Sequence, residues 1–410
     1  MIIGLDTLQD PDSMYPDQPD IRRDVFLNTG SACNLLVDAF SKLPNLRSVG
    51  LRDYDGNGRH RDGDWAKWRS YGWSLGGTHL QERPRQRYAS PDSMLPILLF
   101  ALGKASVKPT NLEAFLRRRR MPDHSFDLSC LQLDVTPVLS GLRTLLLSLN
   151  DNPPFPPQQG SISTGHNHLQ NFLQHTPLLE HLRLNFTNQP VVSSEVCSEG
   201  FLRWFGTPSG VTKHDGSTSV ALAHLTALDL GMLCVTPKTL LQVVSKFAKL
   251  KSLSLWKVNL QCLEDRGDNA GCLWASCLPE IGKAFQAPED FSTVLIGYAG
   301  EMINFNVTDV KFASNVSVDG NGEKKFEDPE GKVSYRKRVG SNVQDWFGNL
   351  GKRAFIEKPE YLDSDDSDDS EGDEDDDGEV DDIDDGEDNE EDNSESDADG
   401  GDEAEVIVLD

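Results

Sequence analysis

"TPKTLLQVVSKFAKLKSLSL", residues 236–255, has the pattern of a helix that is followed, after a short turn, by a strand. Thr236 is a favourable N-cap residue, and Pro237 suits the first position of a helix. Five apolar residues then recur at helical spacing and form one stripe: Leu240, Leu241, Val243, Val244 and Phe247. In the last six residues, 250–255, the final four alternate polar and apolar side chains, as a strand does when only one face is buried.

The strand phrase L-x-x-[LV]-x-L recurs along the chain. The other copies are "LRSVGL" (46–51), "LRTLLL" (142–147), "LEHLRL" (179–184), "LTALDL" (225–230) and the degenerate "LEAFLR" (112–117). Helical patterns precede most of them, at 31–43, 93–102 and 167–175. One such unit cannot bury its apolar face alone, so we expect the copies to stack on a shared core. The sequence therefore predicts an α/β fold, an irregular leucine-rich-repeat solenoid of horseshoe-like form. Chance leucine patterns in another α/β domain are the alternative.

The domain organisation follows from where this repeat begins and fades. The spacing between copies is irregular, and the phrase is lost after Leu260. Residues 291–335 have the pattern of short strands, and 342–350 that of a helix, as expected for a cap on an open end. We expect four parts: a flexible N-terminus (1–20), the solenoid (21–290), a C-terminal capping extension (291–360) and an acidic disordered tail (361–410).

The net charge of −28 belongs to the tail alone. Residues 361–410 contain 28 acidic residues and no Lys or Arg; this leaves 39 of the chain's 67 acidic residues, which balance its 39 basic residues. A neutral body argues against general nucleic-acid binding, which depends on a basic field. A segment as acidic and as poor in aromatic residues as the tail cannot bury enough surface to fold.

The cellular compartment is indicated by cysteine usage and hydropathy. Seven cysteines without a C-x-x-C pair fit a reducing intracellular compartment. No secretory signal pattern is visible at the start, and the longest apolar run, 94–102, is too short to cross a bilayer. We expect an intracellular protein of the cytoplasm, the nucleus or both, without a membrane partner.

The loop "DYDGNGRHRDGD" (53–64) partly matches a calcium-binding loop, with Asp53, Asp55 and Asn57 at the first three ligand positions. A calcium hand needs a helix before this loop, whereas a strand is predicted there, and His60 takes a position that is normally apolar. Four aromatic residues follow within nine positions: Trp65, Trp68, Tyr71 and Trp73. They favour a loop anchored by buried rings over a nucleic-acid stacking platform, because acids and bases balance across the segment.

No motif of a reaction centre is present: the sequence lacks G-x-S-x-G, a phosphate-binding loop and H-E-x-x-H. We therefore expect no enzymatic activity, no cofactor and no metal site. The function that remains is protein binding by the face of the sheet whose side chains point away from the core. The repeat phrase places seven residues there: Arg52, Ser148, His181, Arg183, Asn185, Asp229 and Trp256. Arg183 and Trp256 are the expected hot spots, with the alternative that the extension after residue 290 covers Trp256.

The tail carries two further predictions. Serines followed by acids at the spacing read by acidophilic kinases predict phosphorylation of Ser364, Ser367, Ser370, Ser394 and Ser396. The chain then ends in an aliphatic run between acids, Val406, Ile407, Val408 and Leu409. Such a run favours an extended strand that adds to a partner's sheet, and it resembles motifs that bind the small ubiquitin-like modifier SUMO. The alternative is an edge strand folded back onto the protein's own sheet.

Residues 43–73 and 333–350 resemble segments of filamentous-fungal proteins of the F-box and leucine-rich-repeat type, and the similarity covers about residues 20–360. Such proteins dock on the adaptor of a cullin ubiquitin ligase through an F-box, and their repeats are taken to hold the substrate. No F-box is recognisable here, because the first repeat begins near Ile21. The resemblance thus implies a repeat-only relative or a sequence that lacks its start. The alternative function is an acidic nuclear interaction protein whose tail binds basic partners such as histones.

Overall fold

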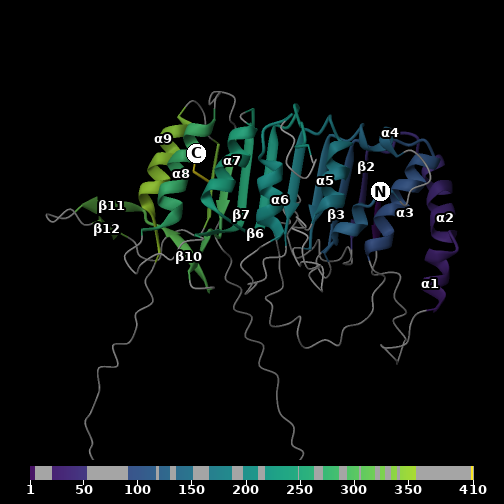
Figure 1. Ribbon diagram of the computed structural model, residues 1–410, viewed down its shortest axis with the longest axis horizontal. Helices are drawn as coiled ribbons and strands as arrows, with labels where there is room; N and C mark the ends of the chain where they lie inside the picture. The colour runs from purple at the N-terminus through teal and green to yellow at the C-terminus, as the bar shows by residue number, and fades with distance from the viewer. Residues whose placement is uncertain are drawn as a thin grey trace, which may run out of the picture. The chain divides into compact units, whose positions relative to one another are not determined.

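A mostly parallel β-sheet runs through the described part of the chain and carries helices along one face (Figure 1). The computed structural model describes residues 1–4, 21–52, 91–116, 120–129, 135–150, 166–186, 197–210, 218–247, 249–262, 271–285, 293–303, 306–318, 324–327, 334–338, 342–356 and 408–409. All of them belong to one structural unit, Met1–Ile356 with Val406–Asp410.

The strands of the main path follow one another in chain order. They are β1 (Ile2–Gly4), β2 (Ser48–Arg52), β3 (Asn111–Phe115), β4 (Thr144–Ser148), β5 (His181–Asn185), β6 (Ala227–Val235), β7 (Ser252–Gln261), β8 (Thr293–Gly297), β13 (Ser334–Arg338) and β15 (Val408–Leu409). Every neighbouring pair from β1 to β8 is parallel. A doubly wound fold would instead reverse its strand order at a switch point.

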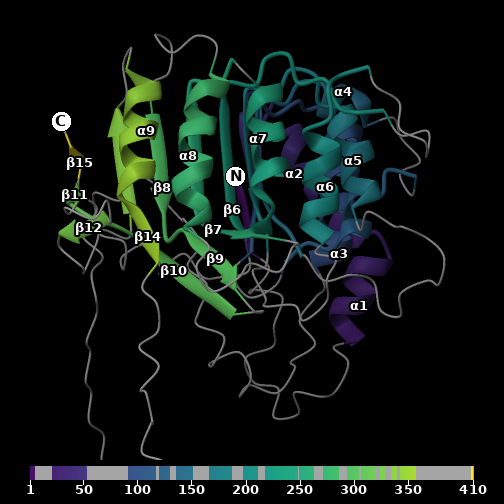
Figure 2. The ribbon, with the colours of Figure 1, turned by 60° about the vertical axis from the view of Figure 1, so that its left-hand side comes forward.

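The helices stand side by side on one face of this sheet, as Figures 1 and 2 show. They are α1 (Ile21–Asn28), α2 (Ser31–Ser41), α3 (Pro91–Lys104), the 3₁₀ turn η3 (Asp123–Phe126), α4 (Thr136–Leu139), α5 (Asn167–Gln174), α6 (Cys197–Phe205), α7 (Pro237–Lys246), α8 (Leu273–Ala284) and α9 (Val343–Arg353). Helix α7 begins as predicted, with the Thr236 side chain accepting a hydrogen bond from the Thr239 backbone N–H at 3.2 Å.

The core lies between the helices and two rows of strand residues that are in register across the sheet. One row consists of Val49, Leu112, Leu145, Leu182, Leu228, Leu253 and Val294, and the other of Leu51, Ala114, Leu147, Leu184, Leu230, Leu255 and Ile296. In β2 and in β4 to β7 these residues are the fourth and sixth positions of the repeat phrase, and burial of each leucine stabilises the fold by about 2 kcal/mol. Since side chains alternate along a strand, the residues between them occupy the opposite, helix-free face.

Three neighbouring strands share a backbone irregularity at one level of the sheet. Met232, Lys257 and Tyr298 have positive φ values of 56°, 52° and 49°. Each directly follows a residue of one register row, Gly231, Trp256 or Gly297. Beyond this extra residue the pairing resumes, and the next side chains return to the core. A left-handed conformation costs a non-glycine residue on the order of 1–3 kcal/mol, so contacts with neighbouring residues must stabilise this conformation at all three positions.

The C-terminal extension packs its helix α9 against α8 and adds antiparallel strands. Strand β9 (Gly300–Ile303) pairs with β7 and with β10 (Asn306–Phe312), which pairs with β14 (Ala354–Ile356). A separate hairpin consists of β11 (Asn315–Val318) and β12 (Lys324–Glu327). Helix α9 approaches α8 so closely that a Cβ at Gly351 would lie 2.8 Å from Cδ of Pro279.

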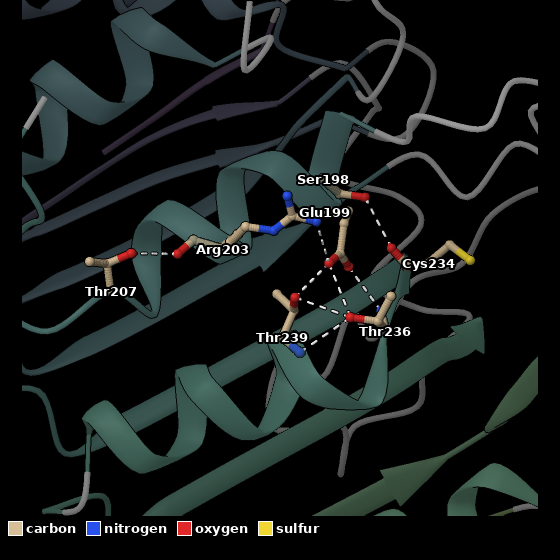
Figure 3. A network of polar contacts seen from close by, with 7 residues as sticks. All are labelled: Ser198, Glu199, Arg203, Thr207, Cys234, Thr236 and Thr239. Carbon is tan, nitrogen blue, oxygen red and sulfur yellow. Dashed lines mark hydrogen bonds and ion pairs between the residues drawn. The ribbon is translucent and has the colours of Figure 1, made fainter. Parts of the chain in front are cut away.

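Three helices begin at a carboxylate that another element supplies. Glu199 of α6 accepts hydrogen bonds from the Thr236 backbone N–H at 2.8 Å and from the Thr236 and Thr239 hydroxyls, at the start of α7 (Figure 3). Asp123 of η3 accepts the backbone N–H groups of His168 and Leu169 in α5. Glu301 of β9 accepts the backbone N–H of Trp274 in α8. A carboxylate at these positions satisfies orphan donors and complements the helix dipole.

The α/β class is confirmed, and five of the six predicted strand phrases overlap strands that begin two residues after the phrase. The degenerate phrase 112–117 is out of step: β3 begins at Asn111, and Leu112 and Ala114 join the core rows, whereas Phe115 lies opposite Arg52. The predicted helices at 31–43, 93–102, 167–175 and 342–350 correspond to α2, α3, α5 and α9. Two features were not anticipated. Residues 2–4, assigned to a flexible terminus, form β1, and the main parallel sheet continues past residue 290 into β8.

Candidate functional site

The helix-free face of the sheet holds an ion pair between two register partners. Arg183 of β5 lies opposite Asp229 of β6. Arg183 Nε donates to Asp229 Oδ2 at 2.8 Å, Arg183 Nη2 lies 2.7 Å from the same oxygen, and His181 Nε2 lies 3.0 Å from it. The Arg183 guanidinium also lies 5.7 Å from the centre of the Phe115 ring. We call His181, Arg183 and Asp229 the charged row.

The ionic state of Asp229 is set by burial and by the two residues that contact its carboxylate. Burial raises the pKa of the Asp229 carboxyl, but the hydrogen bond from His181 and the charge of Arg183 outweigh it and hold this pKa below its ordinary value. Asp229 is therefore ionised at neutral pH. Only 7% of Arg183 and 6% of Asp229 is exposed, whereas the His181 side chain is 32% exposed. Of the charged row, His181 is the residue that a partner can reach most readily.

A second cluster, Trp256, Lys257 and Tyr298, lies at the level of the left-handed residues; we call it the aromatic corner. The Trp256 and Tyr298 rings meet edge to face with centroids 4.8 Å apart. Lys257 Nζ lies 5.7 Å from the centre of the Tyr298 ring. All three residues are half-buried. Burial lowers the pKa of Lys257, and the charge of Asp309 partly opposes this shift.

The charged row and the aromatic corner are close in the sheet. Asp229 and Ser254 are register partners on β6 and β7, and Trp256 follows Ser254 two residues along the same strand. Adjacent strands are about 4.8 Å apart, and side chains two residues apart share a face. Ser254 Oγ is buried, without a hydrogen-bond partner among the described residues. The two clusters thus form one polar and aromatic surface over β5, β6 and β7.

The seven residues predicted for this face all lie in register rows of the helix-free side. His181, Arg183 and Asp229 come into contact. Asn185 packs over Gly231, where a Cβ would lie 2.5 Å from Asn185 Oδ1. Arg52 lies away from them on β2, 3.6 Å from Glu113, and Ser148 is buried on β4. Trp256 contacts the extension through Tyr298, and the ring is half-buried rather than fully covered.

Sequence reasoning missed Lys257, Tyr298 and Ser254. The repeat phrase itself could have paired Arg183 with Asp229, because they occupy the same position of consecutive copies. Nothing in the phrase indicates the extra residue after Gly231 and Trp256 that gives the left-handed row. Tyr298 lies in the extension, so its contact with Trp256 depends on β8 joining the parallel sheet.

Several other predicted features lie outside the described residues. These are the loop 53–64 with the aromatic residues after it, the serines Ser364, Ser367, Ser370, Ser394 and Ser396, and Val406 and Ile407. Within the described ranges, no three His, Cys, Asp or Glu side chains come together in a way that could hold a metal ion. No helix in that same part of the chain has the length and hydropathy needed to cross a membrane.

Comparisons of the chain with models of known protein families, with curated proteins and with solved structures found no match. The proposed function therefore rests on the sequence and on the geometry of the helix-free face.

Proposed function

We propose that this protein is a non-catalytic, protein-binding solenoid of the leucine-rich-repeat type. The parallel strands in chain order, the helices along one face and the in-register leucine rows support this fold. The helix-free face carries no helix of the described residues along β2 to β8, although Arg183, Asp229 and Ser254 are buried there. It is the surface on which side chains from many strands can meet one partner.

The contact surface consists of the aromatic corner together with His181 of the charged row. The observation that supports it is the left-handed backbone shared by Met232, Lys257 and Tyr298. Strained conformations of this kind concentrate at functional sites. Here they place a half-buried tryptophan, a tyrosine and a lysine in one cluster. Trp and Tyr are favoured in binding hot spots, and a partly desolvated lysine binds a partner's carboxylate.

The partner is a protein substrate, and the chain is the substrate-recognition part of a ubiquitin ligase system of the F-box type. The resemblance of residues 43–73 and 333–350 to F-box and leucine-rich-repeat proteins supports this role. Co-purification of a cullin adaptor with the protein tagged at its own chromosomal gene tests it, because no F-box for docking the adaptor is recognisable in this sequence. A preparation that retains its substrate but never the adaptor would leave protein binding standing and overturn the ligase role.

A matched pair of charge reversals tests the contact surface. Lys257→Glu changes the aromatic corner, whereas Lys238→Glu makes the same change on the exposed surface of α7. We expect Lys257→Glu to reduce partner recovery from cell extract at least about tenfold, and Lys238→Glu to leave it unchanged. Circular dichroism confirms that both variants fold. Equal recovery with both variants would overturn the assignment of this face.

The second candidate is the acidic nuclear interaction protein, favoured by the 28 acidic residues of 361–410. In that case the tail binds basic partners such as histones by charge, and binding weakens steeply as salt rises. Deleting residues 361–410 would then abolish partner recovery, and Lys257→Glu would not affect it. Recovery that survives the deletion supports the sheet face instead.

A further inference from the structure

The last strand of the main path comes from the end of the chain. On one side, β13 pairs antiparallel with β8 through five residue pairs, from Ser334 opposite Gly297 to Arg338 opposite Thr293. On its other side it pairs in parallel with β15, with Arg336 opposite Val408 and Lys337 opposite Leu409. Strand β15 lies at the yellow end of the chain in Figure 2. Without β15, the backbone N–H and C=O groups on that side of β13 would form an open edge.

The basic sequence of β13 is complementary in charge to the acidic sequence that precedes β15. The sequence of β13, "SYRKR", contains three consecutive basic residues, Arg336, Lys337 and Arg338. The sequence that ends in β15 is aliphatic, and 28 acidic residues and no basic ones occur from 361 to 410. Lysine and arginine on an edge strand discourage pairing with unrelated strands. They attract a strand that arrives with acids around it.

We propose that the β13 edge is a docking site for an aliphatic strand in an acidic context, and that the chain's own β15 occupies it. Within the described residues, two residue pairs join β15 to β13, so few backbone hydrogen bonds hold the two strands together. Because β15 belongs to the same chain, docking is intramolecular and benefits from an effective concentration of the order of millimolar. The edge therefore stays occupied if the intrinsic Kd of the strand pair is below about 1 mM, and a competing strand can still displace β15.

This docking limits what the chain's end can do. The backbone edge of Val408 and Leu409 that pairs with β13 cannot pair with a partner's sheet at the same time. A partner that adds its strand to this same edge of the run 406–409, as SUMO could, has to compete with β13. The proposal does not depend on the role of the helix-free face, because the edge of β13 is a different part of the sheet.

Proline substitution tests the docking in the full-length protein. Proline has no backbone N–H and is excluded from paired strand positions. We expect the double variant Val408→Pro, Leu409→Pro to accelerate amide hydrogen exchange of residues 334–338 at least about fivefold. The control Ala404→Pro lies outside β15 and should leave this exchange unchanged. Identical exchange of β13 in the wild type and the double variant would overturn the proposal.

A peptide-binding experiment tests whether the chain's own end occupies the β13 edge. A fluorescent peptide of residues 390–410 should bind the double variant, whose edge is vacant, at least about tenfold more tightly than the wild type. If exchange at β13 instead rises on dilution of the wild type, a second copy supplies the strand and docking within one chain is disproved. The proposal would also be disproved if SUMO protected residues 406–409 from hydrogen exchange while the double proline variant left the exchange of β13 unchanged.

Discussion

Arg183 and Asp229 lie opposite each other on neighbouring parallel strands and form a buried ion pair, with Arg183 Nη2 2.7 Å from Asp229 Oδ2. Removing one partner leaves the other charge buried without compensation, which costs about 3–5 kcal/mol. We expect Arg183→Met to lower the free energy of unfolding by about 3 kcal/mol in urea titration. The double variant Arg183→Met, Asp229→Leu should recover most of this loss. Equal destabilisation by both variants would contradict the pair.

The same carboxylate makes stability depend on pH in the acidic range. The Asp229 pKa is lower in the folded protein than the ordinary value of about 3.9 in the unfolded chain. Its stabilising contribution is therefore complete above about pH 4, and is lost as pH falls through the folded-state pKa. Asp229→Asn should flatten the fall in melting temperature below pH 4. An unchanged acid profile in this variant would show that Asp229 does not contribute to it.

The carboxylate of Glu199 caps α7 from α6 and is nearly buried. Glu199→Gln keeps the shape but removes the charge that accepts three hydrogen bonds from the start of α7 and one from Arg203, so we expect a loss of about 2 kcal/mol. Glu280→Gln is the matched control, because Glu280 is half exposed and pairs with the exposed Lys283. It should cost less than about 0.5 kcal/mol. Chemical denaturation of both variants measures the difference.

Two glycines of α9 allow a test of the contact between α8 and α9. A Cβ at Gly351 would lie 2.8 Å from Pro279 Cδ and 2.9 Å from the Ala275 backbone oxygen, whereas a Cβ at Gly348 meets nothing within 4 Å. Gly351→Ala should therefore destabilise the protein by about 1–3 kcal/mol. Gly348→Ala should stabilise it by up to about 1 kcal/mol through helix propensity. Thermal unfolding that ranks them in the opposite order would contradict this contact.

Lys246 adds a pH dependence on the alkaline side. Burial lowers its pKa to about 8, while its ammonium donates to the Phe205 backbone oxygen at 2.7 Å and to Ser219 Oγ at 2.6 Å. A neutral amine keeps two N–H donors, so both bonds survive deprotonation. Between this pKa and about 10.4 the unfolded chain binds more protons, so stability rises with pH across that interval. Lys246→Met should remove the rise, and the exposed Lys238→Met should retain it.

The parts of the fold that depend on local periodicity could be predicted from the sequence. Leucines at positions such as 228 and 230 repeat at strand spacing, and Thr236 with Pro237 indicates where α7 begins. The cap that Asp123 gives to α5 joins residues 45 positions apart and leaves no periodic pattern. Strand β1 has only three residues, Ile2–Gly4, and forms because β2 offers an edge in register.

The candidate site was predictable in part for the same reason. Alternation places Arg183 and Trp256 on the helix-free face, since both lie between core positions of the phrase. Their burial and contacts depend on neighbouring strands, which a single phrase does not describe. Lys257 was missed because regular alternation would place it toward the core. The left-handed conformation at φ 52° instead adds one residue before Val258 returns to that side.

The carboxylates that start α5, α7 and α8 each come from a different element, Asp123, Glu199 and Glu301. None of these helices completes the hydrogen bonding of its first turn while the neighbouring element is unfolded. The free energy of capping thus couples neighbouring helices and strands to one another rather than stabilising each helix by itself. Such nearest-neighbour coupling makes a stacked array unfold cooperatively, and local melting at one repeat spreads to the next. A chain with internal spacing as irregular as this one can thereby behave as a single folding unit.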